Sequence, residues 1–299
     1  MSARTGWART QRRAFLCGLA PALIVLAVVT LGPAIYLVAT SLTPFTPVTS
    51  GSGLDFSHPF ANYVQALWHS SCPHSVLLQA ELSVLTVGMQ TLAGVGLALL
   101  LDVDSRWMEV LRTGFLVPMV LPPIVVAIIW KLLTTPDVSP AYAVFAWFGL
   151  RPGSLVTNPT TALPLIAFAD TWEWFPFTML MVLAALQMMP REQIEAAHID
   201  GASGAQMFWH VRLPFIRPAP TVAALFRLID SIKAFPLIYV LTDGGPGRAT
   251  EVTNYYAFIQ TFNFAYWGYG SAIATMMVAG VFALSLLIGR LGFGRDEDA

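Results

Sequence analysis

Long apolar stretches, separated by short polar segments, make up most of the chain. A helix of about 20 apolar residues crosses a bilayer. The stretches that reach this length cover residues 15–42, 76–101, 110–133, 163–189, 215–241 and 266–288. Prolines fall inside the first, third and fifth stretches, where we expect the helices to bend against neighbouring protein. The pattern predicts an all-α membrane protein with six transmembrane helices.

The composition agrees with a membrane-embedded chain. Hydrophobic residues make up 56% of the chain and charged residues 11%, whereas a soluble domain carries about 25% charged residues. The two cysteines, Cys17 and Cys72, are expected at very different depths, so no disulfide is predicted. The histidines are scattered and show no metal-binding spacing. Contact with membrane lipid is expected, and a nucleic-acid partner is not.

Basic residues predict the orientation of the helices. If the N-terminus is cytoplasmic, only Arg151 and Arg248 lie in outer segments. The cytoplasmic segments then hold Arg4, Arg9, Arg12, Arg13, Arg106, Arg112, Arg191, Arg212, Arg217, Arg290 and Arg295. This bias follows the positive-inside rule and places both termini in the cytoplasm.

The same count predicts how the chain is divided. We expect a cytoplasmic segment of residues 1–14, a transmembrane domain of residues 15–289 and a cytoplasmic tail of residues 290–299. The first apolar stretch is too long for a signal peptide and is interpreted as an uncleaved helix. The loop of residues 190–214, between the fourth and fifth helices, also falls on the cytoplasmic side.

This loop is the longest polar interruption in the second half of the chain. Pro190 suits a helix start, because the N–H that proline lacks would be unpaired there anyway. Asp200 and Gly201 supply a break, and a second short helix fits residues 202–209. By shape alone, a plain helix–turn–helix connector and a docking element are about equally supported.

The sequence of the loop resembles the EAA loop of permease subunits of ATP-binding-cassette importers. The matching residues are Glu195, Ala196, Ala197, Asp200, Gly201, Ala202, Leu213 and Pro214. In that family the loop is a coupling helix that docks into a groove of the ATPase subunit. The resemblance therefore implies that residues 190–214 transmit movement from a separate ATPase.

Further motifs resemble the sugar-permease branch of that family, the maltose-importer type. They are Asn62-Tyr63, Trp172 to Phe177 followed by Gln187 and Pro190, Leu241 to Pro246 followed by Thr250, and Gly268 to Ala272. The resemblance implies a multi-pass protein of the bacterial inner membrane that imports a sugar or related polyol by alternating access. It also implies three partners: a second permease of similar fold, an ATPase dimer and an extracytoplasmic solute-binding protein. Pro236 and Asp243 depart from the family pattern and leave the particular sugar open.

No signature of chemistry carried out by this chain is found. The run Gly244-Gly245-Pro246-Gly247 lacks the Lys-Ser/Thr that completes a phosphate-binding loop. No catalytic constellation can be identified from the sequence. We expect no enzyme activity and no bound cofactor, with ATP and magnesium held by the partner ATPase.

Charged residues inside the expected helices are the remaining candidates for function. They include Glu81, Asp170, Glu173, Arg227, Asp230 and Lys233. Charge is costly in lipid, so each should face protein or a water-filled path. Glu173 and Asp230 are expected at similar depth, and Arg227, Asp230 and Lys233 share one helix face.

Two interpretations of these charges stay open. One is a structural ion-pair network between the fourth and fifth helices. The other is a polar lining of the translocation path, for which the candidates are Trp172, Glu173, Trp174, Arg227, Asp230 and Lys233. The two tryptophans could stack on a sugar ring, although packing or interface placement is more typical of tryptophan.

Other functions compete with sugar import. The same architecture could import a glycerol phosphodiester or a polyamine, and Arg227 with Lys233 keeps a phosphate-bearing solute open. An ion-driven secondary transporter would need internal repeats with discontinuous helices, which the sequence does not show. A membrane-embedded enzyme would need a catalytic constellation, which is not found.

Overall fold

The computed structural model describes residues 2–47, 55–68, 70–103, 105–136, 138–148 and 153–293. The side chains of residues 2–17 and 287–293, and of a few residues near 145, are not described. Arg151 and Arg295 therefore lie outside the described residues, and so do the side chains of Cys17, the N-terminal arginines and Arg290. The expected cytoplasmic tail lies largely outside as well.

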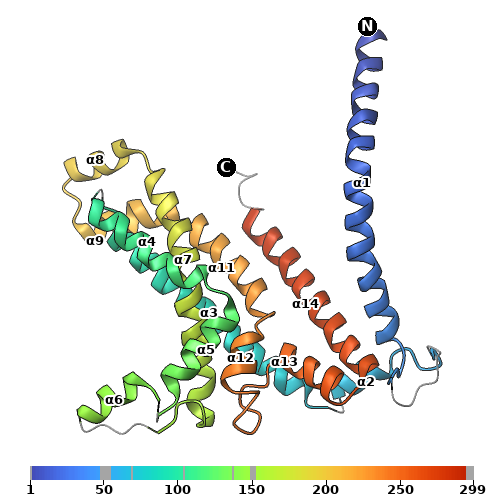
Figure 1. Ribbon diagram of the computed structural model, residues 1–299. Helices are drawn as coiled ribbons and strands as arrows, with labels where there is room; N and C mark the ends of the chain where they lie inside the picture. Colours follow the sequence, from blue (N-terminus) through green and yellow to red (C-terminus); the bar gives the residue numbers. More distant parts are fainter. Residues whose placement is uncertain are drawn as a thin grey trace. The chain divides into compact units, whose positions relative to one another are not determined.

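Every regular element of the described residues is a helix (Figure 1). The α-helices are α1 (Ser2–Ser41), α2 (Ala61–Trp68), α3 (Cys72–Leu101), α4 (Arg106–Val120), α5 (Pro123–Thr134), α6 (Pro140–Trp147), α7 (Pro159–Gln187), α8 (Arg191–Ile199), α9 (Gly204–Gln206), α10 (Leu213–Ile216), α11 (Pro218–Ser231), α12 (Pro236–Leu241), α13 (Thr253–Phe258) and α14 (Trp267–Phe293). Two π-helices complete the set, η1 (Met207–Arg212) and η2 (Ile259–Asn263). The prediction of an all-α chain is confirmed for these residues.

Three helices are long and apolar enough to cross a membrane on their own. They are Gly18–Ser41 within α1, Cys72–Leu101 and Trp267–Leu286 within α14. The pair α4 and α5 passes the same test together but bends by 98° at its break. The chain is therefore a multi-pass membrane protein, and the count of six spans stays a prediction.

Two predicted helices, which are expected to bend at their prolines, are interrupted in the structure. The expected helix 110–133 is interrupted between α4 and α5, where Leu121 and Pro122 are extended with ψ of 141° and 137°. A proline forces the residue before it out of the helical conformation, and Pro122 and Pro123 do so in succession. The expected helix 215–241 is likewise interrupted between α11 and α12, just before Pro236.

Side chains donate hydrogen bonds to backbone carbonyl groups at the break between α11 and α12. Gln79 of α3 donates from Nε2 to the carbonyl of Ser231 at 3.0 Å, and the Ser231 and Ser83 hydroxyls lie 2.8 Å apart. Asn254 donates to the carbonyl of Lys233 at 3.0 Å. The gap between α11 and α12 is thus a hydrogen-bonded structure, which is what non-helical backbone requires at membrane depth.

The described helices fall into two compact units. The first comprises residues 1–70 and 257–276, and the second residues 71–256 and 277–299. In the second unit, α7 packs against α3, α4, α5, α10, α11 and α12. Its position at the centre explains why most of its residues are buried.

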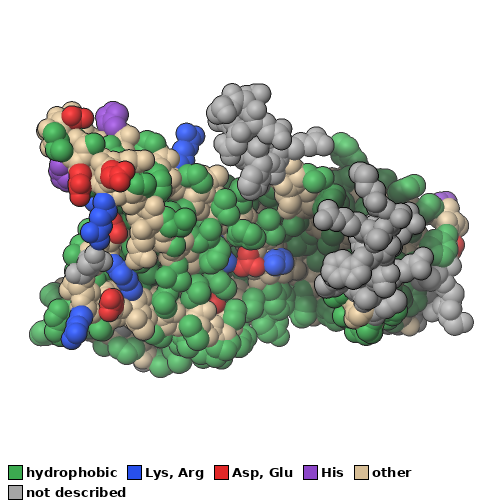
Figure 2. Space-filling model, turned by 90° about the horizontal axis from the view of Figure 1, so that it is seen from above, with side chains coloured by type: hydrophobic (Ala, Val, Ile, Leu, Met, Phe, Trp, Pro, Cys, Tyr) green, Lys and Arg blue, Asp and Glu red, His purple; other side chains and the backbone are tan. Residues whose placement is uncertain are grey.

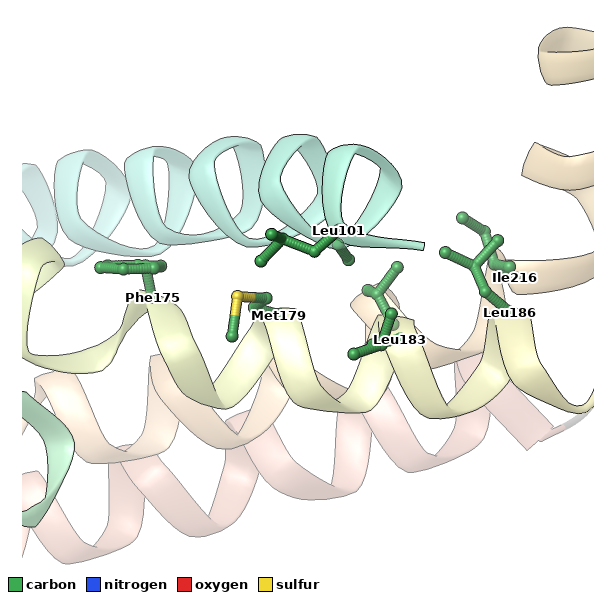
Figure 3. Packing of buried hydrophobic residues seen from close by; sticks show 8 residues of the cluster. Leu101, Phe175, Met179, Leu183, Leu186 and Ile216 are labelled. Atoms are coloured by element: carbon green, nitrogen blue, oxygen red, sulfur yellow. The ribbon is translucent and has the colours of Figure 1, made fainter. Parts of the chain in front are cut away.

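The core of the second unit lies where α3, α7 and α10 meet (Figure 3). It consists of Ala98, Leu101, Phe175, Met179, Val182, Leu183, Leu186 and Ile216. Gly94 lies on α3 one turn before Ala98. A Cβ on Gly94 would lie 2.6 Å from the Cβ of Thr178 on α7, so only glycine allows α3 and α7 to approach this closely. This packing fixes the end of α7 from which the chain enters α8.

Candidate functional site

The segment of residues 190–214, called the α8 segment below, forms the helix and turn that the sequence predicts. Pro190 precedes the first residue of α8, and Asp200 follows the last. Gly201 has φ of +73°, a conformation that costs other residues strain. The N–H of Ala202 donates to the carbonyl of Ala197 at 3.0 Å, which closes the helix end.

The second half of the segment is helical but is not one regular helix. Ser203 and Gln206 form a reciprocal capping box around α9. The backbone then widens into the π-helix η1, and Leu213 and Pro214 open α10. The predicted short helix 202–209 is therefore α9 continued by the first turn of η1.

The outer part of the α8 segment is exposed. None of the residues of α8 is buried, and Ile199 is 85% exposed. Within the second unit, α8 and α9 lie at the end opposite α6 (Figure 1). Figure 2 shows acidic and histidine side chains gathered at this end. The segment thus presents an acidic surface with an apolar residue at its tip.

The rear of the α8 segment is anchored. Met207 is 5% exposed, and Ile216, two residues after the end of the segment, is fully buried in the core cluster. Arg212 lies 3.8 Å from a carboxylate oxygen of Asp102, just beyond the end of α3. Force applied to α8 would therefore pass through packed side chains to α3 and α7.

A buried polar group, called the Arg227 cluster below, lies between α3, α7 and α11. Arg227 is 4% exposed. Its guanidinium donates to Gln90 Oε1 at 2.9 Å, to Asp230 Oδ2 at 2.6 Å and to Asp170 Oδ2 at 3.4 Å. The ring of Trp174 covers it, with its centre 4.4 Å from the guanidinium carbon. One cation therefore holds three helices together.

Gln90 is the link that the sequence analysis missed. Its amide nitrogen donates to Asp170 Oδ2 at 2.7 Å, while its oxygen accepts from Arg227. A signal was available, because Gln79, Ser83, Thr86 and Gln90 follow helical spacing along an apolar helix. All four are buried and face α7 and α11.

The structure brings Asp170, rather than Glu173, to Arg227. Glu173 is 1% exposed and lies on α7, but its Oε1 atom has no hydrogen-bond partner among the described residues. An ion pair between the fourth and fifth predicted helices is present, and Asp170 supplies the carboxylate from the fourth. The Asp170 position was named as a charge but was not among the site candidates.

The other path candidates lie at the edge of the cluster or away from it. Lys233 Nζ is 3.1 Å from Asp230 Oδ1, and the two side chains are 66% and 43% exposed. In Figure 2, a group of acidic and basic side chains near the middle of the view is surrounded by apolar side chains. Trp172 belongs to a different group, with its ring 6.0 Å from Trp130.

The motif of residues 241–250 folds on itself as a structured loop. Asp243 and Gly244 have φ of 52° and 78°. Tyr255 donates to Asp243 Oδ1 at 2.6 Å, and Thr250 donates to the carbonyl of Gly245 at 2.8 Å. Burial, together with this hydrogen bond and the Asp243 charge, raises the pKa of the Tyr255 phenol.

Two further motifs make hydrogen bonds within the first unit. Asn62 donates to the carbonyls of Ser41 and Thr43 at 2.9 and 2.8 Å. Gly268 donates to the carbonyl of Phe45 at 2.9 Å, and a Cβ there would lie 2.0 Å from the Thr43 oxygen. These residues hold the segment after α1, which is a structural role.

Comparison with known proteins identifies the class. Residues 90–293 match the family described as binding-protein-dependent transport system inner membrane component. The match covers more than half of the chain, which therefore belongs to this family of transporter permeases. The resemblance that the α8 segment suggested is confirmed.

Individual relatives give a finer comparison. The chain is 34% identical over 240 residues to the trehalose/maltose transport system permease protein MalF of Thermococcus litoralis, covering 79% of this chain and 80% of the relative. It is 32% identical over 275 residues to the sulfoquinovosyl glycerol transport system permease protein SmoG of Agrobacterium fabrum, covering 90% and 86%. A chain in the crystal structure of a bacterial alginate ABC transporter with its alginate pentasaccharide-bound periplasmic protein aligns with a TM-score of 0.81. That alignment covers 96% of both chains at 18% identity, so it supports the fold alone.

Proposed function

We propose that the chain is one permease subunit of an ATP-driven importer of the bacterial inner membrane. Its solute is a carbohydrate or related polyol. The partners are a second permease of similar fold, an ATPase dimer that holds ATP and magnesium, and an extracytoplasmic solute-binding protein. The solute class rests on relatives named for trehalose, maltose and sulfoquinovosyl glycerol, which align with most of this chain.

One observation carries the coupling part of this proposal. The α8 segment is exposed at its tip and anchored at its rear, as a lever between an ATPase and the transmembrane helices requires. Closure of the ATPase dimer pushes α8, and the Arg212–Asp102 ion pair and the buried Ile216 pass the movement to α3 and α7. The helices then move as rigid bodies and open the path to the other side.

The geometry of the Arg227 cluster favours a carbohydrate over the charged alternatives. A glycerol phosphodiester would need free cations, but Arg227 already contacts two carboxylates and Gln90. A polyamine would need several carboxylates without basic partners, but Asp170 contacts Arg227 and both oxygens of Asp230 accept from basic groups, so Glu173 alone of the carboxylates on α7 and α11 is left without a cation. In this proposal the buried part of the cluster braces the helices, and Asp230 and Lys233 border the path.

A matched pair of glycines tests the coupling. Gly201 and Gly204 both lie in the α8 segment with open space where a Cβ would be, but only Gly201 has positive φ. Gly201→Asp strains the end of α8 by about 1 kcal/mol or more. It should abolish the stimulation of ATP hydrolysis by loaded solute-binding protein while the complex still co-purifies.

Gly204→Asp is the control and should keep most of the stimulation. The measurement is ATPase activity of the reconstituted complex with and without loaded binding protein. If Gly201→Asp were stimulated like wild type, the α8 segment would be a plain connector and the coupling proposal would fail.

A further inference from the structure

Glu173 on α7 is a buried carboxyl group without a partner. Its side chain is 1% exposed, and its Oε1 atom accepts no hydrogen bond from the described residues. No basic side chain in the described part of the chain lies within ion-pair distance of it. A carboxyl group in this setting is costly. We therefore expect it to have a partner in another arrangement of the helices.

The guanidinium of Arg227 already lies against the turn of α7 that contains Glu173. It is 3.4 Å from Oδ2 of Asp170, which precedes Glu173 by three residues. Its carbon is 4.4 Å from the ring centre of Trp174, which follows Glu173 directly. Side chains three residues apart are neighbours on a helix surface. Asp170 and Glu173 thus occupy neighbouring positions on α7 beside one cation.

The contacts of Arg227 are unequal, and the one to α7 is the longest. Charge-assisted N–H···O bonds are typically about 2.7–2.9 Å long. The bond to Asp230 is 2.6 Å and lies within α11, so it moves with that helix, whereas the contact to Asp170 is 3.4 Å. Asp170 does not depend on this contact alone, because Gln90 donates to the same oxygen at 2.7 Å. The contact between Arg227 and Asp170 is therefore the one that is most easily exchanged.

The polar side chains of α3 permit such an exchange. Gln79 and Ser83 lie one turn apart on α3, and both contact Ser231 at the end of α11. Thr86, which is also buried, lies nearly one turn further along the same face. A shift of α11 by one turn moves Ser231 from Gln79 and Ser83 to Ser83 and Thr86. The end of α11 thus keeps polar partners after the shift.

The packing distinguishes a fixed pair of helices from one that can shift. α3 and α7 are in close contact at Gly94, where a Cβ would lie 2.6 Å from the Cβ of Thr178. α11 ends at the break after Ser231, and α10 joins its beginning to the α8 segment. Movement of the α8 segment therefore reaches α11 directly along the chain. The helix that carries Arg227 is the one on which this movement acts.

Other partners suit Glu173 less well. Lys131 makes no ion pair within the described structure, but it is exposed on the last turn of α5. The neighbouring Trp130 is the residue of α5 that faces α7, through contacts with Phe168 and Trp172. A solute would have to displace protein to reach a side chain that is 1% exposed.

We propose that Glu173 is the second acceptor for Arg227 in the transport cycle. In the arrangement described here, the Asp170 register, Arg227 contacts Asp170. In the other arrangement, the Glu173 register, α11 has shifted along α7 by three residues, roughly 4.5 Å, and Arg227 contacts Glu173. Packed helices favour such discrete arrangements over gradual sliding. The inference rests on the proposed function, because it needs an ATP-driven cycle with two arrangements of the helices.

Two pairs of cysteines report which register is occupied. The rings of Phe177 on α7 and Phe226 on α11 lie 6.5 Å apart in the Asp170 register, and the shift moves Phe226 to Leu180. The affinity-tagged chain, with Cys17 and Cys72 replaced by Ser, is purified with its partners. Phe226→Cys is combined with either Phe177→Cys or Leu180→Cys and treated with a short bismaleimide. The two pairs should link in opposite states of the complex, one without nucleotide and the other trapped with ATP and vanadate.

Two isosteric substitutions should then favour opposite registers. Glu173→Gln removes the charge of the second acceptor, so the 177–226 link should form in both states. ATP hydrolysis by the complex with its solute-binding protein should fall by about tenfold or more. Asp170→Asn should instead favour the 180–226 link in both states. Glu173→Asp keeps the charge and should restore part of the hydrolysis, and Lys131→Met is the control and should behave like the unsubstituted chain.

Several results would overturn the inference. The same link in both states of the chain with Asp170 and Glu173 intact would do so without any change to the cluster. Normal links and normal hydrolysis in Glu173→Gln would make this residue a core group without a role in the cycle. Normal links with lost transport in Glu173→Gln would place it in the path, and an effect of Lys131→Met equal to that of Glu173→Gln would make Lys131 its partner. If no ATPase co-purified, the proposed function would fail, whereas a complex that hydrolyses ATP without changing its links would contradict the inference alone.

Discussion

The Arg227 cluster and the α8 segment hold polar residues of similar kinds in opposite settings. In the cluster, a guanidinium, a carboxylate and an amide are buried and contact one another across three helices. In the α8 segment, Glu192, Glu195 and Asp200 are exposed, and α8 itself has no buried residue. The comparison shows that, in a chain with few charged residues, a group of polar residues marks one of two things. It is either a contact made within the chain or a surface left exposed for contact with another protein.

Removal of the central cation of the cluster should give the largest effect. Arg227→Met leaves the buried Asp170 without its cation, and breaking such a buried pair costs about 3–5 kcal/mol. We expect a large loss of folded chain, measured as the yield and the thermal midpoint of the purified complex. Lys233→Met is the control, because this exposed cation should contribute less than about 1 kcal/mol.

A second substitution sharpens the argument. Arg227→Met combined with Asp170→Asn should recover part of the lost yield, since the uncompensated charge is removed. If Arg227→Met alone were as stable as wild type but impaired in transport, the cluster would serve the path rather than the bracing of helices.

Two isoleucines distinguish the anchored and the exposed ends of the α8 region. Ile216 is fully buried and Ile199 is 85% exposed. Ile216→Ala should lower the free energy of unfolding by about 2–5 kcal/mol, because it opens a cavity in the core. Ile199→Ala should leave the thermal midpoint unchanged and reduce co-purification of the ATPase. Equal thermal shifts in both variants would contradict the description of α8 as a free surface.

Tyr255 should give the smallest effect. Its pKa is raised by burial and by Asp243, so the neutral phenol is the form that the folded state favours. The resulting stabilisation is complete below the ordinary tyrosine pKa of about 10 and decreases as pH rises above it. Tyr255→Phe should cost about 1 kcal/mol at neutral pH.

The control for Tyr255 is its pH dependence. The thermal midpoint of the Tyr255→Phe variant should fall less than that of wild type between about pH 10 and 11, where the ordinary phenol begins to ionise. Parallel curves would mean that the hydrogen bond to Asp243 does not affect the ionisation of Tyr255.

The sequence was sufficient to predict the helical class and the α8 segment. Apolar stretches of bilayer length need no tertiary information, and the turn at Gly201 is encoded locally by the glycine itself. The family resemblance added the transporter assignment, which single residues could not supply.

The breaks in the helices and the partners of Arg227 could not be predicted in the same way. Prolines occur in many membrane helices, so Pro122 and Pro236 indicated bends without indicating full interruptions. Asp170 and Glu173 are three residues apart on one helix, and only the packing of α11 against α7 decides which of them meets Arg227. Gln90 carries no charge, so a search for charges at membrane depth passed over it.

The two-sided hydrogen bonding of Gln90 has a consequence for the evolution of this chain. Its amide donates to Asp170 and accepts from Arg227, so a change at any one of these positions leaves a buried group of the others unsatisfied. A lineage can therefore alter the three positions only together, through intermediates that fold poorly. Across related permeases these residues should change as a set or stay fixed, while Lys233, at the exposed edge, is free to vary with the solute.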